Sequence, residues 1–116
     1  MVETTFGGDV MTTVKIAKDF TRFPSGRYKK GGNTSGEAFR EKFLEVPLRQ
    51  GERVVVDFDG TIGYGSSFLE EAFGGVVRSL KLPSDFVLNH LEFVSSDPTI
   101  TEEVRQYIID AGNRAR

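Results

Sequence analysis

One uninterrupted apolar run constrains how this chain of 116 residues can fold. Residues 53–58 are Arg-Val-Val-Val-Asp-Phe, and three successive β-branched residues favour an extended strand over a helix. A run with so little polar alternation is typical of a central strand that is covered on both faces. We therefore expect residues 53–58 to form the middle of a sheet.

Further strands and helices are predicted to alternate around this run. Apolar spacing predicts a half-buried strand within residues 10–20, a third strand over 91–95, and helices after each strand. Residues 21–36 are rich in glycine, so we expect a long loop there. The order strand, helix, repeated three times, implies a layered α/β fold with right-handed crossovers, within one domain spanning residues 1–116.

Short-range patterns predict where the first two helices begin and end. Thr34 followed by Glu37 forms a capping box, which marks the start of a helix. Pro47 is expected to end this helix. The next helix should begin at Ser66 or Ser67, because serine is a preferred N-cap residue.

The composition is that of an ordinary globular protein. Hydrophobic residues make up 38% of the chain and charged residues 28%, with a net charge of −2 and no cysteine. No apolar run is long enough for a membrane span, so we expect a cytoplasmic protein without a membrane partner. The acidic balance argues against nucleic-acid binding. The sequence does not predict an oligomeric state.

Charge is distributed unevenly along the chain. Residues 15–53 hold ten Lys or Arg against five Asp or Glu, and residues 54–103 hold two against nine. This asymmetry is compatible with ordinary solvated faces, with complementary faces inside the fold, or with a dipolar docking surface.

Two carboxylates follow the apolar run directly. Asp57 and Asp59 are spaced like the nucleophile and the acid-base residue of a haloacid-dehalogenase-type phosphatase. Such an enzyme needs further acidic residues to hold magnesium. Beyond Asp57 the adjacent acidic pairs are Glu70 with Glu71 and residues 102–103, all predicted on helix surfaces. We expect no metal site, and we keep the phosphatase as an alternative.

Paired hydroxyls mark the start of the middle helix. Gly65 precedes Ser66 and Ser67, and apolar residues then recur at helical spacing. Backbone N–H groups at a helix N-terminus lack partners within the helix, so a serine there can cap the helix or hold an anion. A hydrolase built on Ser66 would need a base, and the single histidine, His90, has no acidic neighbour in sequence.

Three short motifs resemble the STAS-like domain family of unknown function. They are Pro-x-Gly-Arg-Tyr at residues 24–28, Ser-Gly-x-x-Phe-Arg at 35–40, and Gly-Ser-Ser-Phe-Leu-x-Glu-x-Phe-Gly at 65–74. The resemblance implies a STAS-like layered sheet of mixed strands with crossover helices packed on it. It also adds three motif residues, Arg27, Ser35 and Arg40, to the expected partner-binding or regulatory set.

The chain is also similar to the STAS domains of anti-sigma-factor antagonists. In those domains a partner ATPase of the histidine-kinase-like type phosphorylates the serine that corresponds to Ser66. Gly65 stands here in place of their Asp, and Phe68 in place of their Gly. Phosphate on Ser66 would add nearly two negative charges close to Asp57 and Asp59.

The sequence therefore predicts a non-enzymatic regulatory or adaptor domain without a cofactor. It would bind a partner protein, such as a histidine-kinase-like ATPase, at the surface around Ser66, Ser67, Gly65, Asp57 and Asp59. Nucleotide binding at the glycine-rich loop, residues 24–36, stays open as a further alternative, although the loop lacks the usual phosphate-binding lysine motif.

Overall fold

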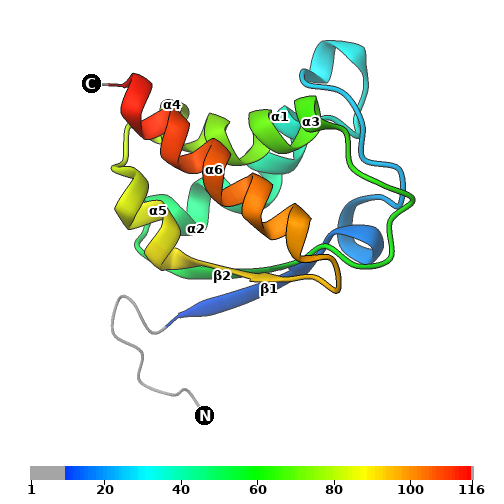
Figure 1. Cartoon of the computed structure of the whole chain (residues 1–116), viewed down its shortest axis with the longest axis horizontal. Coiled ribbons are helices and arrows are strands. Elements are labelled where there is room, and N and C mark those ends of the chain that lie inside the picture. Colours follow the sequence, from blue (N-terminus) through cyan, green and yellow to red (C-terminus); the bar gives the residue numbers. More distant parts are fainter. Residues whose placement is uncertain (1–9, 116) are drawn as a thin grey trace.

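A small parallel sheet forms the base of the molecule. This computed structural model describes residues 10–115. Its strands β1 (Met11–Lys15), β2 (Arg53–Asp57) and β3 (Leu91–Val94) pair in the order β1-β2-β3 (Figure 1). The predicted α/β class with crossover helices is confirmed, and the described strands all run parallel, where mixed directions were expected.

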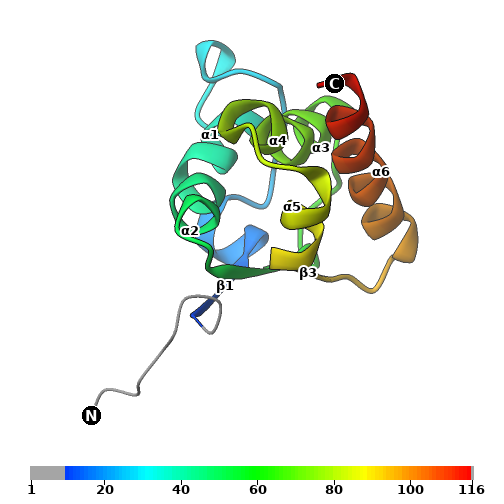
Figure 2. The same ribbon diagram turned by 90° about the vertical axis from the view of Figure 1, so that its left-hand side faces the viewer.

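The helices cover one face of the sheet (Figures 1 and 2). Two right-handed crossovers that step in the same direction across a sheet place their helices on the same side. Along β2, Val54 and Val56 are fully buried under the helices, while Arg53 is exposed and Val55 is only half-buried. The expectation of a strand covered on both faces is therefore wrong for residues 10–115.

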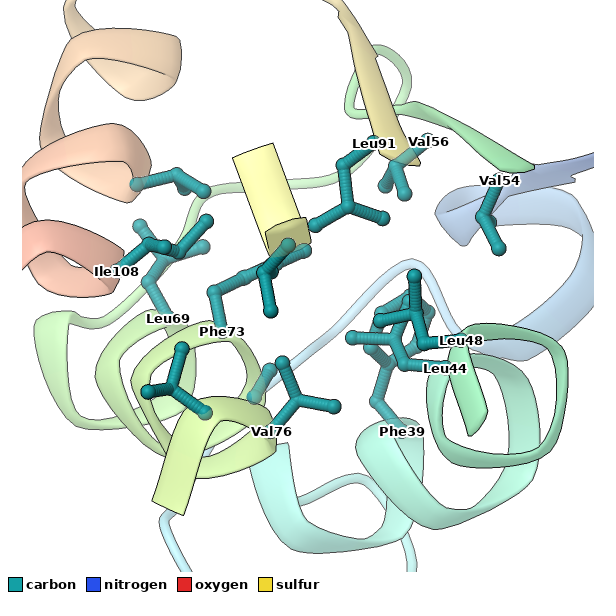
Figure 3. Packing of buried hydrophobic residues seen from close by; sticks show 14 of the residues in the cluster. Phe39, Leu44, Leu48, Val54, Val56, Leu69, Phe73, Val76, Leu91 and Ile108 are labelled. Atoms are coloured by element: carbon teal, nitrogen blue, oxygen red, sulfur yellow. The ribbon is translucent and has the colours of Figure 1, made fainter. Parts of the chain in front are cut away.

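Aromatic rings fill the space between the sheet and the helices. The rings of Phe39 and Phe73 lie 6.0 Å apart, and those of Phe58 and Phe73 lie 5.6 Å apart. Such pairs contribute about 0.5–1.5 kcal/mol each beyond their burial. Leu69 and Ile108 close the core on the side of the last helix (Figure 3).

The first crossover helix contains a π-helical turn. It consists of α1 (Gly36–Phe39), the π-turn η4 (Arg40–Leu44) and α2 (Glu45–Arg49). Its N-cap is Ser35, whose Oγ accepts a hydrogen bond from the N–H of Ala38 at 3.1 Å. The predicted capping box at Thr34 is wrong by one residue.

The π-turn also changes which side chains face the core. An extra residue in the turn rotates the buried face, so Leu44 and Leu48 are fully buried and Val46 is 53% exposed. The helix continues through Pro47, contrary to the sequence-based expectation. Pro47 lies shortly after the π-turn η4, which already interrupts the regular i→i−4 hydrogen-bond ladder of the helix.

The second crossover helix has the same construction. It runs through α3 (Ser66–Leu69), the π-turn η5 (Glu70–Gly74) and α4 (Gly75–Leu80). A short helix that the sequence did not predict, α5 (Ser84–His90), leads into β3. Helix α6 (Pro98–Arg114) then packs along the second crossover helix. The remaining turns are η2 (Ile16–Phe20) and η3 (Lys29–Gly31).

Candidate functional site

The predicted serine pair lies at the exposed start of helix α3. Gly65 occupies the N-cap position in an extended conformation, and Ser66 and Ser67 are the first two helical residues. The expectation that one of these serines caps the helix is therefore wrong. Both side chains are exposed, and the Ser67 hydroxyl makes no hydrogen bond within the described part of the chain. The Ser67 hydroxyl is thus without a partner among the described residues, and the Ser66 hydroxyl is exposed beside Tyr107.

Ser66 lies beside helix α6. The Tyr107 hydroxyl donates a hydrogen bond of 2.6 Å to Glu103 Oε2, and this bond, together with burial, raises the pKa of Tyr107 to about 12. Ser66 is close enough to form a hydrogen bond with the Tyr107 hydroxyl, and this contact lowers the pKa of Tyr107. A negative group on Ser66 would therefore be placed near the carboxylate of Glu103.

The three sequence motifs meet in one buried ion cluster beneath this helix start. Arg40 from the second motif contacts Glu71 from the third, with Nη2 and Oε2 3.0 Å apart, and each residue is only 7% exposed. Arg27 from the first motif reaches the other oxygen of Glu71 at 3.2 Å. Arg40 also pairs with Glu45. We call these residues, with Glu70 and Arg78, the ion cluster.

Glu70 connects the ion cluster to the surface. Its carboxylate accepts hydrogen bonds from Arg78 at 2.6 Å and from Arg27 at 2.5 Å. The hydrogen bond from Arg78 is the main reason that the pKa of Glu70 is lowered, and the bond from Arg27 acts in the same direction. The pKa of Arg27 is raised by its hydrogen bond to Glu70. Glu70 is therefore held in its ionised form by two guanidinium groups.

Two glycines, Gly36 in the second motif and Gly75 directly after the third, make room for this arrangement. A Cβ on Gly36 would lie 2.4 Å from the carbonyl oxygen of Phe68, so only glycine lets the two crossover helices approach this closely. A Cβ on Gly75 would lie 2.9 Å from Arg40 Nε, a buried atom that has no hydrogen-bond partner in residues 10–115.

The two halves of the charge asymmetry thus meet inside the fold. Arg27 and Arg40 come from the basic part of the sequence, and their partners Glu70 and Glu71 come from the acidic part. The expectation that both glutamates lie on a helix surface is wrong for Glu71, which is buried. The sequence left three interpretations of the charge asymmetry open. For these four residues, the structure matches complementary faces inside the fold.

The acid pair at the end of β2 has a visible structural role. Asp57 Oδ1 accepts a hydrogen bond from the N–H of Asp59 at 2.9 Å. Asp59 Oδ1 in turn accepts from the N–H and the hydroxyl of Ser96, at 2.8 and 3.0 Å. Among the described residues, no three His, Cys, Asp or Glu side chains gather closely enough to hold a metal ion. These contacts tie the end of β2 to the loop after β3.

His90 and the glycine-rich loop are the remaining sequence features that suggested other functions. His90 Nδ1 lies 2.8 Å from the carbonyl oxygen of Phe86, and the two rings stack 4.0 Å apart, so His90 belongs to the end of α5. In the glycine-rich loop, Arg27 is engaged by the ion cluster and Lys29 pairs with Glu41 at 2.6 Å. Lys30, the third cation of this loop, is exposed and forms no ion pair within the described residues, so nucleotide binding at the loop stays an untested alternative.

A hollow of about 890 Å³ opens at the far end of the second crossover helix. Its lining includes Val77 from α4, Leu82 from the link between α4 and α5, Leu88 from α5 and Ile109 from α6. None of the predicted site residues lines it. The hollow and the serine helix start are therefore separate features.

Sequence reasoning missed three residues that complete the site. Glu71 and Arg78 belong to the ion cluster, and Tyr107 lies beside Ser66. Only Glu71 carried a sequence indication, because it is the fixed glutamate of the third motif. Arg78 and Tyr107 lie outside the motifs, and their contacts with the site depend on how the helices pack.

The fold and the motif residues define a STAS-like α/β domain, with a serine helix start above a buried ion cluster. The chain matches the family described as STAS-like domain of unknown function (DUF4325) over residues 35–101, and it belongs to that family. Searches of curated proteins and of solved structures gave no significant match. Within residues 10–115, every helix is too short or too polar to cross a bilayer.

Proposed function

We propose that this protein is a non-enzymatic regulatory domain that binds a partner protein through the surface around Ser66 and Ser67. The partner is an ATPase of the histidine-kinase-like type, which phosphorylates one of the two serines. The observation that carries this proposal is the pair of exposed hydroxyls that do not cap the helix, because Gly65 occupies the N-cap.

The charges around Ser66 give its phosphorylation a physical effect. Free N–H groups and the helix dipole favour an anion at the first two positions of a helix. Glu103, near Ser66, and Glu70, one turn along the helix, oppose it. Like unit charges at 4 Å repel by about 1 kcal/mol in water and by several kcal/mol at a protein surface. A phosphate therefore changes the charge of this surface without entering the core.

The ion cluster supports the proposal by fixing the surface from below. Arg27, Arg40 and Glu71 join the loop before α1 to the π-turns η4 and η5 through buried and partly buried contacts. A surface of fixed shape loses little entropy on binding a partner. We assign Arg27, Arg40 and the N-cap Ser35 this supporting role, while the serines make the contact.

The test is phosphorylation by a purified histidine-kinase-like ATPase with ATP, followed by mass spectrometry and by measurement of complex formation. We expect phosphate on Ser66 or Ser67, lost in the matched Ser→Ala variants and retained in Ser25→Ala, which removes another exposed serine. The absence of both phosphorylation and complex formation would contradict the proposal. Magnesium-dependent turnover of a generic phosphoester that is abolished by Asp57→Asn would instead support the alternative function, a haloacid-dehalogenase-type phosphatase.

A further inference from the structure

Three polar side chains connect the serine helix start to helix α6. The Tyr107 hydroxyl donates a hydrogen bond of 2.6 Å to Glu103 Oε2, and the Ser66 hydroxyl lies within hydrogen-bonding reach of the Tyr107 oxygen. We call Ser66, Tyr107 and Glu103 the Ser66 relay. The Ser67 hydroxyl has no such contact within the described residues. The two serines of this helix start therefore differ in their surroundings.

The contact between Ser66 and Tyr107 agrees with how the two helices pack. Helix α6 runs beside α3 and the turn η5 that follows it (Figures 1 and 2). Further along the same helices, Arg114 Nη2 on α6 lies 3.8 Å from Glu70 Oε2. Tyr107 also lines one hollow together with Glu70, the residue one turn after Ser66. These contacts place the face of α6 that carries Tyr107 against the helix that Ser66 begins.

The direction of the two hydrogen bonds follows from their chemistry. An ionised carboxylate can only accept, so the single proton of the Tyr107 hydroxyl points toward Glu103. The Tyr107 oxygen is then left to accept from Ser66, whose own proton is directed toward α6. Because Ser66 is exposed, the lone pairs of its oxygen remain accessible from solvent. A hydroxyl that attacks an incoming group needs this orientation.

Glu103 is also suited to take up a proton. It forms no ion pair within residues 10–115. Glu70 is held in its ionised form by two guanidinium groups, and Glu71 is engaged by the buried ion cluster. Carboxylates that are stabilised in this way are poor proton acceptors. Asp110, which lines the same hollow, accepts a hydrogen bond from Gln106 at 2.9 Å.

We propose that the ATPase phosphorylates Ser66 and not Ser67, and that Tyr107 and Glu103 take up the Ser66 proton during the transfer. This inference rests on the proposed function. The Ser66 oxygen forms a bond to the γ-phosphorus of ATP while the bond from that phosphorus to ADP breaks. The Ser66 proton moves to the Tyr107 oxygen as the Tyr107 proton moves to Glu103, which then releases it to water. Tyr107 contacts the reacting hydroxyl, and Glu103 acts through Tyr107 as a positioning residue.

The experiment measures the rate of phosphorylation by the ATPase of the test above and locates the phosphate by mass spectrometry. We expect phosphate on Ser66 in the wild-type protein and in Ser67→Ala, and none in Ser66→Ala. Tyr107→Phe removes only a hydroxyl, and Glu103→Gln keeps an acceptor oxygen that does not take up a proton. Each should lower kcat by roughly tenfold or more at little changed KM, because a positioned proton acceptor typically contributes at least that much.

Two matched controls separate the relay from the general properties of this surface. Tyr28→Phe removes a hydroxyl from the same hollow, and that hydroxyl forms no hydrogen bond within the described residues. Glu102→Gln neutralises the exposed neighbour of Glu103 on α6. Both variants should be phosphorylated at the wild-type rate. Circular dichroism checks that every variant is folded.

The outcomes distinguish this inference from the proposed function. Phosphate on Ser67 of the wild-type protein, or a wild-type kcat in either Tyr107→Phe or Glu103→Gln, would overturn the relay and leave the proposed function standing. A raised KM with unchanged kcat would assign Tyr107 to docking alone and would also overturn the relay. If the ATPase phosphorylates neither serine and forms no complex, both proposals fail together.

Discussion

Replacing Glu71 with glutamine perturbs the ion cluster at its centre. The substitution keeps the volume of the side chain and removes its negative charge. Glu71 contacts three guanidinium groups, those of Arg40 at 3.0 Å, Arg27 at 3.2 Å and Arg78 at 3.4 Å. Arg40, with a side chain only 8% exposed, then keeps Glu45 as its one remaining carboxylate partner.

The size of the effect follows from this burial. Removing one partner of a buried ion pair costs about 3–5 kcal/mol, because the other charge is left without full compensation. Arg40 retains Glu45, and Glu70 still holds Arg27 and Arg78, so we expect the lower end, about 3 kcal/mol. A domain of this size has a total stability of about 5–15 kcal/mol, so the loss is large yet measurable.

The assay is urea denaturation followed by circular dichroism, with the free energy of unfolding obtained by linear extrapolation. A double-mutant cycle with Arg40→Met isolates the pair. We expect the double variant to lose at least about 1 kcal/mol less than the sum of the two single losses, because removing both charges leaves neither uncompensated.

An exposed ion pair provides the control. Lys29 Nζ and Glu41 Oε1 lie 2.6 Å apart, but their side chains are 52% and 40% exposed. Glu41→Gln should therefore cost less than about 1 kcal/mol. If Glu71→Gln costs no more than Glu41→Gln, and the cycle shows no coupling energy, the ion cluster is solvated and the reasoning from burial is refuted.

Three further predictions follow from the same contacts. Gly36→Ala should destabilise the protein by about 2 kcal/mol or more, measured by urea denaturation, because its Cβ would collide with the backbone of Phe68. The lowered pKa of Glu70 contributes stability above about pH 4.5, which is lost as the pH falls through the folded-state pKa. Glu70→Gln should therefore flatten the acid limb of a plot of stability against pH. Asp59→Ala should speed hydrogen exchange at the N–H of Ser96 and lower stability by about 1–2 kcal/mol.

Each of these three predictions has a control variant or a result that would contradict it. Gly31→Ala adds a methyl group where nothing lies within 4 Å, and an equal cost at both glycines would contradict the steric argument for Gly36. An acid limb that is unchanged in Glu70→Gln would show that other carboxylates control acid unfolding. Glu102→Ala removes an exposed carboxylate from α6, and exchange at Ser96 should not respond to it.

Local sequence patterns were sufficient for most of the framework. The β-branched run correctly placed β2, and the apolar spacing after Ser67 correctly placed the second crossover helix. These predictions hold because the side-chain period of a strand or helix depends on residues close in sequence. Helix boundaries and buried faces were less predictable, because the N-cap is Ser35 and the first crossover helix, with its π-turn η4, buries Leu44 and Leu48 while Val46 is exposed.

The sequence by itself determined the α/β class, the family, and the presence of a serine pair at a helix start. Only the tertiary structure decided that Glu71 is buried against Arg40, that Gly65 takes the cap, and that Tyr107 lies beside Ser66. Arg27 and Glu70 are 43 positions apart in sequence, so their contact arises from helix packing. Short-range spacing sets which element a residue joins, but the neighbours of its side chain depend on how distant elements meet.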